Sequence, residues 1–403
     1  MRSIFDAIER SDTSPKRNSE DTFAFLNRVS GIVWERQRRL LERWYADFPD
    51  SDGDLRRRLR SRSPQQHFAA WWELYVHALF RALGYKVTVH PVVPGTTGHP
   101  DFLVERTSES YYVEAATVFS GIVVPPTRGG RLKASIEDIL STIDASTFFV
   151  ALQWDRIGET MPKSREIVEQ VNAWLATLDP EEVAAAEAAL RHNDGWHPFT
   201  VGDWEFSLRP HAWGSKLQGC PDNPFIGYGP VIAGTVNDTP QIRNAIVRKG
   251  KRYGTPDKPL VVAVLATSGL VGDREVTNAL FGSESVRLAI ASGESTIVRN
   301  PDGVWIGRRG ASGRRISAVL MGVGIMPNTV ASAWPVLWHH YDAAYPLDAE
   351  LPFSTTRIVA DRAQHEEASL SAVEIFDLPP DWPGPEPAFP RCAHRPQDHS
   401  PPT

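Results

Sequence analysis

The chain has 403 residues, of which 41% are hydrophobic and 23% charged, and its formal net charge at pH 7 is −6. This length suits two domains, or one domain with an insertion. The composition is that of an ordinary soluble protein, no apolar run approaches the ~20 residues of a membrane span, and the N-terminus lacks a secretory signal. The only cysteines, Cys220 and Cys392, are far apart, which argues against a disulfide framework or a cysteine-based zinc site. We therefore expect a cytoplasmic protein without membrane association.

Positive charge is clustered along the chain although the net charge is negative. Basic runs occupy residues 56–62, 248–252 and 308–315. Such runs are usually solvated helix ends or loops, and an acidic protein has no global attraction for nucleic acid. Several runs in one acidic chain still favour a local face that contacts phosphate.

The N-terminal region is predicted to be helical after a flexible segment at 1–20. Apolar residues recur at three- and four-residue spacing from residue 21, and we assign 21–63 to a helical N-terminal segment. A further helix is expected from Pro64 to Leu83, with Gly84 as its C-terminal stop. Glu73 and His77 lie one turn apart at the edge of its apolar stripe.

The rest of the chain alternates between strand and helix patterns until about residue 345. Strands are predicted at 86–90, 101–105, 111–118, 147–154, 259–267, 304–306 and 316–323, and helices at 131–143, 163–192 (broken at Asp179-Pro180), 241–253 and 275–281. Order is expected to fade after about residue 350, and proline density and low apolar content predict disorder from Leu378 on, so we assign 346–403 to an extended, largely disordered tail. The adjacent His339 and His340 face different ways on any regular element and have no matching Cys/His set, so they do not indicate a metal site.

Two carboxylates are predicted to face each other on a β-hairpin. If the turn is centred between residues 107 and 108, Phe102 faces Val113 and Asp101 faces Glu114. Directly opposed residues project to one face with Cβ atoms ~5 Å apart. Such close carboxylates repel unless a cation lies between them, and this donor set suits Mg²⁺. The alternative is a surface hairpin with two solvated acids.

This arrangement resembles the PD-(D/E)XK nuclease superfamily, which has the restriction-endonuclease-like fold. Pro100-Asp101 resembles its Pro-Asp, Glu114 its second acid, and Glu73 the helix acid that many members carry. The resemblance covers about residues 65–118, with a second part at 241–267. It implies that Asp101, Glu114 and Glu73 are ligands of Mg²⁺ or Mn²⁺ and that the substrate is a nucleic acid.

The chain departs from the superfamily pattern at Ala116, where the motif has a lysine that shares a face with the second acid. Either the site is inactive or the lysine comes from elsewhere. Lys249 is the principal candidate, because it continues the apolar stripe of Ile242 and Ile246 on the 241–253 helix. A buried lysine is unusual without a partner. The alternative is a lysine whose stem is buried and whose ammonium interacts with the helix C-terminus. Lys251 and Lys133 are lesser candidates.

The predicted fold class is therefore α/β, with a restriction-endonuclease-like mixed sheet flanked by helices. We assign residues 64–345 to this domain, with a mixed insertion at about 156–238, although placing Lys249 at the site requires everything from 120 to 238 to be inserted. The predicted function is metal-dependent hydrolysis of phosphodiester bonds, with DNA favoured over RNA. Asp101, Glu114 and Lys249 would be the catalytic residues. The alternative is a catalytically inactive nuclease fold that binds nucleic acid or a protein partner.

Overall fold

The structure is a computed structural model that describes residues 3–93, 98–119, 128–188, 195–214, 219, 224–227, 237–252, 256–269, 271–288, 295–359 and 362–385. The chain divides into two compact units. The first consists of 1–12, 22–123 and 235–387, and the second consists of 13–21, 124–234 and 388–403. Both cysteines lie outside the described residues. No described helix is both long enough and apolar enough to cross a membrane.

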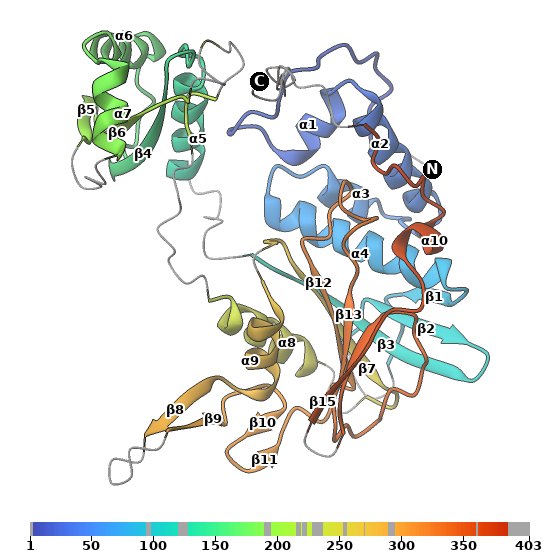
Figure 1. The fold of residues 1–403 in the computed structure, drawn as a ribbon. Coiled ribbons are helices and arrows are strands. Elements are labelled where there is room, and N and C mark those ends of the chain that lie inside the picture. The colour runs from blue at the N-terminus through green and yellow to red at the C-terminus, as the bar shows by residue number, and fades with distance from the viewer. Residues whose placement is uncertain are drawn as a thin grey trace, which may run out of the picture. The chain divides into compact units, whose positions relative to one another are not determined.

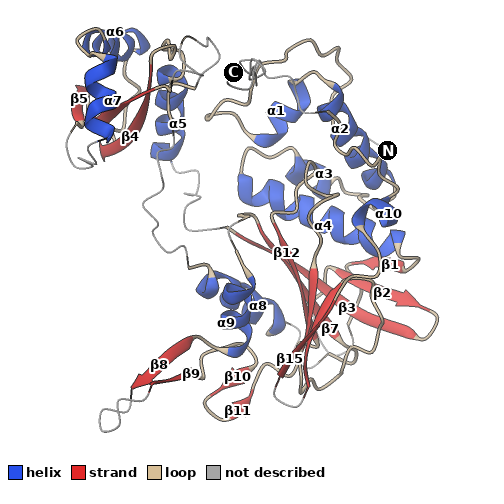
Figure 2. Cartoon of the chain, in the orientation of Figure 1, coloured by secondary structure: helices blue, strands red, loops and turns tan. Residues whose placement is uncertain are grey.

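The first unit is built on a mixed sheet of eight strands (Figures 1 and 2). In spatial order they are β1 (Lys86–Val89), β2 (Phe102–Arg106), β3 (Glu109–Val118), β7 (Leu260–Ala266), β12 (Ala318–Val323), β13 (Val336–His339), β14 (Ser354–Val359) and β15 (Arg362–Glu366). The three central strands β3, β7 and β12 are parallel. β7 is buried along its whole length, as expected for a strand covered on both faces. The prediction of an α/β protein with a large mixed sheet is confirmed.

The β2–β3 hairpin has the predicted register. Phe102 pairs with Val113 and Arg106 with Glu109, so the turn is centred between residues 107 and 108. Phe102 and Val113 project into the core beneath α4. Because side chains alternate along a strand, Glu114 projects to the opposite face of β3.

Helices cover both faces of the sheet. One face packs against α4 (Pro64–Ala82), and the Trp72 indole donates a hydrogen bond to the Ala263 carbonyl of β7 (2.9 Å). The other face packs against α8 (Thr239–Gly250) and α9 (Asp273–Phe281). Around α4 lie α1 (Thr22–Arg28), α2 (Ile32–Ala46), α3 (Asp54–Leu59) and α10 (Ala372–Phe376). The helical pattern expected from residue 21 is interrupted at Gly31, whose φ of 119° is incompatible with a helix.

The prediction of a disordered tail from residue 346 is wrong for the described part of that segment. β14 pairs with β13, β15 pairs with β14, and α10 packs on α4. The buried side chains of Phe353 and Phe376 anchor the segment in the core. Local composition concealed this order, because most of the stabilising contacts are long-range. Residues 386–403 lie outside the described part.

Two small hairpins extend the first unit beyond its main sheet (Figure 1). They are formed by β8 (Glu284–Leu288) with β9 (Ser295–Arg299), and by β10 (Ile306–Gly307) with β11 (Gly310–Ala311). β10 and β11 thus replace the single strand expected at 304–306.

The second unit has its own small sheet and its own core. Its strands are β4 (Phe148–Arg156), β6 (Trp204–Ala212) and β5 (His197–Val201), in that spatial order, and its helices are α5 (Arg128–Leu140), α6 (Ser164–Leu175) and α7 (Pro180–Ala188). The core includes Ile136, Val150 and Trp204. Because β4 pairs with β6, the expected strand at 147–154 belongs to this unit. The inserted unit therefore starts at Val124, before the assigned boundary of about 156.

Candidate active site

Asp101 and Glu114 lie at one end of the β2–β3 hairpin. Asp101 immediately precedes β2, and its Oδ2 accepts a hydrogen bond from the Ala115 backbone N–H (2.8 Å). Glu114 lies in the middle of β3, opposite Val262 of β7, and is fully buried. The sheet therefore fixes both carboxylates through backbone contacts, one by its strand position and the other by a direct hydrogen bond.

The structure brings Lys249 to both of these carboxylates. Its Nζ lies 2.5 Å from Glu114 Oε2 and 3.2 Å from Asp101 Oδ2. Ile242 and Ile246 pack α8 against the sheet, and Lys249 follows one turn later on the same face. The apolar stripe of α8 therefore determines where the ammonium lies.

Ala116 occupies the position where the motif lysine would project. It is buried in the same core cluster as Ile242 and Ile246. Since Ala116 and Glu114 share a face of β3, α8 covers the place that a side chain from residue 116 would fill. A small residue at 116 allows α8 to approach the strand and present Lys249 instead.

Burial and mutual charge control the protonation of this cluster. Burial and then the neighbouring Asp101 carboxylate raise the pKa of Glu114 to about 8, although the Lys249 ammonium lowers it. Burial alone would lower the pKa of Lys249, but the two carboxylates outweigh it and the pKa is raised. Lys249 therefore remains a cation at neutral pH, and any loss of that charge leaves two repelling acids.

Glu73 was predicted to be a metal ligand, and in the structure its carboxylate pairs with Arg58. The Arg58 guanidinium donates two hydrogen bonds to its carboxylate, from Nη1 to Oε1 (2.8 Å) and from Nη2 to Oε2 (2.6 Å). Burial raises the pKa of Glu73, Arg58 opposes the shift, and Asp101 adds to it. Glu73 thus interacts electrostatically with Asp101 while its hydrogen-bonding capacity is directed to Arg58.

No group of three or more metal-ligating side chains occurs among the residues that the structure describes. Asp101 and Glu114 therefore form a two-carboxylate set with Lys249 between them. Glu73, the third predicted ligand, is held by Arg58.

Neither the two nearby histidines, His77 and His99, nor the lesser lysine candidates contact this pair. His77 is buried against Phe48, with ring centroids 4.9 Å apart, and burial lowers its pKa to about 4. The His99 Nδ1 lies 3.0 Å from the Pro91 carbonyl oxygen. Lys251 is exposed after α8, and Lys133 lies over the Trp154 ring in the second unit.

The basic run at 56–62 makes extensive intramolecular contacts. Arg57 and Arg58 both pair with Asp54, and Arg60 pairs with Asp6. Sequence reasoning identified this run as a possible phosphate-contacting face and missed Arg58 as the partner of Glu73. No local spacing signals that pairing, because it depends on how α3 packs against α4.

The run around Lys249 is different, since Arg248, Lys251 and Arg252 are exposed at the end of α8. Arg308 and Arg309, in the β10–β11 turn, are also exposed. The carboxylate pair therefore has an adjacent cationic surface on α8.

Comparisons with protein-family models, with curated proteins and with solved structures found no significant match for this chain.

Proposed function

We propose that this protein is a metal-dependent nuclease that hydrolyses phosphodiester bonds, with DNA favoured over RNA. The observation that carries the proposal is the convergence of Lys249 with Asp101 and Glu114. These residues come from separate segments, and Lys249 supplies the cationic group that residue 116 does not. The fold is consistent with this proposal, since it is a mixed sheet flanked by helices.

The donor chemistry of the pair fits a divalent cation. Asp101 and Glu114 offer carboxylate oxygens, which Mg²⁺ and Mn²⁺ prefer, and Mg²⁺ commonly uses only one or two carboxylates. Burial and the neighbouring Asp101 carboxylate raise the pKa of Glu114 even beside Lys249, so a bound divalent cation would favour the ionised form of this acid. When bound, the ion would polarise the phosphodiester and lower the pKa of an attacking water.

The protein residues have distinct roles in this proposal. The Ala115 N–H orients Asp101, and β3 holds Glu114 rigidly in the sheet. Lys249 donates hydrogen bonds to the carboxylates at rest and, with substrate bound, would donate to a phosphate oxygen that gains negative charge. Glu73 would ligate an ion or hold a water only after giving up part of its bidentate contact with Arg58.

The second candidate is a catalytically inactive nuclease fold that binds nucleic acid or a protein partner. The same ion cluster favours it, because Lys249 can neutralise the acids as a purely structural group. Buried ion pairs of this kind occur without any catalytic role. In that case the exposed cations at the end of α8 would bind the phosphate backbone without cleavage.

Cleavage assays separate the two candidates. The protein is incubated with single- and double-stranded DNA and RNA in Mg²⁺ or Mn²⁺, beside Asp101→Asn, Glu114→Gln and a control, Glu105→Gln, from the same hairpin. We expect wild type and Glu105→Gln to cleave, and the other two variants to lose activity by roughly two to three orders of magnitude. Absence of metal-dependent cleavage by well-folded wild-type protein would exclude the nuclease.

A further inference from the structure

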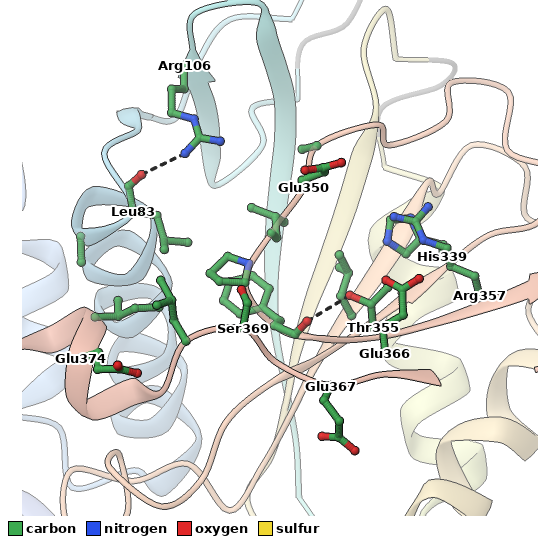
Figure 3. Close-up of a pocket in the computed structure, with 18 residues that line it drawn as sticks. Leu83, Arg106, His339, Glu350, Thr355, Arg357, Glu366, Glu367, Ser369 and Glu374 are labelled. Carbon is green, nitrogen blue, oxygen red and sulfur yellow. Dashed lines mark hydrogen bonds between the residues drawn. The ribbon is translucent and has the colours of Figure 1, made fainter. Parts of the chain in front are cut away.

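The first unit contains a cavity of about 940 Å³ away from the carboxylate cluster (Figure 3). It lies beside β13, β14 and β15, and is bounded by the end of α4 and by the segments around residues 350 and 370. Leu337 of β13 lines it and belongs to the core on the α4 side of the sheet. Glu114 projects to the other face, so the cavity and the candidate active site use opposite faces of the sheet.

His339 is a buried polar wall residue of this cavity. It is only 7% exposed, and its Nε2 is buried without a hydrogen-bond partner among the described residues. Burial, and then the neighbouring Arg357 charge, lower its pKa to about 4. At neutral pH the imidazole is therefore neutral, and it has one nitrogen that can donate and one that can accept. Buried polar groups are normally satisfied, so the unpartnered Nε2 makes His339 an unusual polar residue in the wall of the cavity.

Arg357 supplies a positive charge next to this imidazole. Leu337 pairs with Thr355 across β13 and β14, and the register places His339 beside Arg357 two residues further on. Figure 3 shows both side chains close together near Thr355. Arg357 is partly buried and makes no hydrogen bond or ion pair within the described part of the chain. A half-buried guanidinium without a carboxylate is unusual, since arginine in such places is normally paired.

The floor of the cavity is apolar, whereas its rim is acidic. Leu83, Leu337, Leu351, Phe353 and Ile375 line the floor. Glu350, Glu366, Glu367 and Glu374 line the rim and are exposed, and the exposed Arg106 at the rim pairs with Glu109. Glu366 pairs with Thr355 across β14 and β15, so it lies diagonally from Arg357 on the same face. This combination favours one negative charge at Arg357 and disfavours a polyanion.

We propose that the cavity binds a small molecule with an apolar body and a single carboxylate. The carboxylate accepts hydrogen bonds from the Arg357 guanidinium and from the imidazole N–H of His339. The apolar body lies on the floor. The volume is within the range of small-molecule sites, in which a few polar groups fix the orientation of the ligand. The proposal is independent of the nuclease assignment, because it uses neither the residues nor the sheet face of that site.

Calorimetric titration of the full-length protein with one matched set of probes tests the proposal. The probes are phenylacetate, 2-phenylethanol, 2-phenylethylammonium and phenyl phosphate, which carry one aromatic body and different charges. We expect phenylacetate to bind with a Kd below about 1 mM, and the alcohol, the amine and the dianionic phosphate at least tenfold more weakly. Failure of phenylacetate to bind, or equal binding of the amine or phosphate, would overturn the proposal.

Variants then locate the site. Arg357→Gln should weaken phenylacetate binding about 10- to 100-fold, as expected for a lost charge-assisted hydrogen bond. Arg357→Lys should retain part of the affinity, and the surface control Arg309→Gln should bind as wild type does. Because Arg357 has no protein partner among the described residues, the variants should fold normally. The ¹⁵N resonances of the His339 imidazole, measured in wild-type protein, should shift on addition of phenylacetate. Unchanged resonances, or undiminished binding by Arg357→Gln, would show that the cavity is not the site.

Discussion

The Lys249 ammonium lies 2.5 Å from the Glu114 carboxylate, although 135 residues separate the two in sequence. The contact joins the last turn of α8 to the middle of β3, and it places a cation where a metal ion would otherwise neutralise the acids. Lys249 and a divalent cation therefore compete for the same oxygens at rest. This competition makes metal binding a direct probe of the cluster.

Lys249→Ala should bind Mn²⁺ more tightly than wild type, by at least about tenfold, because a unit charge at this distance contributes on the order of 1 to 4 kcal/mol. Electron paramagnetic resonance of free Mn²⁺ measures the affinity. Cleavage should be lost in the same variant. Lys86→Ala, which changes an exposed lysine of β1, should match wild type in both respects. Weaker Mn²⁺ binding by Lys249→Ala would contradict the proposed location of the ion.

Arg58→Ala should destabilise the protein by about 3 to 5 kcal/mol at pH 7, because it leaves the buried Glu73 carboxylate without its cation. The side chains of Arg58 and Glu73 are only 18% and 16% exposed. Urea unfolding gives the free energies. The matched control is Arg57→Ala, which loses only an exposed pair with Asp54 and should cost less than about 1 kcal/mol. Equal effects of the two variants would mean that the Arg58–Glu73 contact is not structural.

His77 should make the fold sensitive to acid. Burial lowers its folded-state pKa from 6.5 to about 4, so the unfolded chain binds a proton more readily between these values. The stabilising effect of the neutral imidazole is complete above about pH 6.5 and is lost as the pH falls towards 4, a loss of about 3 kcal/mol.

His77→Phe should remove this part of the pH dependence, as measured by urea unfolding at several pH values from 4.5 to 7. Phenylalanine suits the site because Phe48 and Phe102 already surround it. The control is His365→Gln, which changes an exposed histidine and should leave the dependence of the unfolding free energy on pH unaltered. If the free energy of unfolding of His77→Phe changes with pH as steeply as that of the wild type, His77 does not titrate as described.

Gly322 on β12 should not tolerate a side chain. A Cβ atom there would lie 2.7 Å from Trp72 Cη2 and 2.9 Å from Ile325 Cδ1. Gly322→Ala should therefore cost about 1 to 3 kcal/mol through overpacking, measured as a lower midpoint of urea unfolding. Gly269→Ala meets nothing within 4 Å and should leave the midpoint almost unchanged. An unaffected Gly322→Ala would mean that α4 packs less closely on β12 than the structure shows.

The sequence predicted the parts of this molecule that are determined locally. The hairpin register followed from period-two alternation around a short turn, and the inward position of Lys249 followed from the helical stripe of α8. Both patterns are short-range and are carried by neighbouring residues alone. The same alternation predicted that Phe102 and Glu114 project to opposite faces of the hairpin.

The parts that the sequence did not predict depend on contacts between distant segments. Arg58 neutralises Glu73 because α3 packs beside α4, and neither helix carries a signal of the other. β14 and β15 resembled a tail because their stability comes from pairing with β13 and from Phe353 in the core. The expected strand at 147–154 was real, but its pairing partner, β6, could not be read from its own residues.

In the sequence, the main segment of the second unit (124–234) lies between β3 and β7, and this order affects how the protein is synthesised. These adjacent parallel strands form the centre of the sheet, yet the ribosome completes the entire inserted unit between them. The Asp101–Glu114 hairpin therefore emerges long before α8 and β7 exist to cover it. Such non-local pairing has high contact order and delays folding of the first unit. A nascent chain that ends before Lys249 therefore carries Asp101 and Glu114 without the lysine that contacts both.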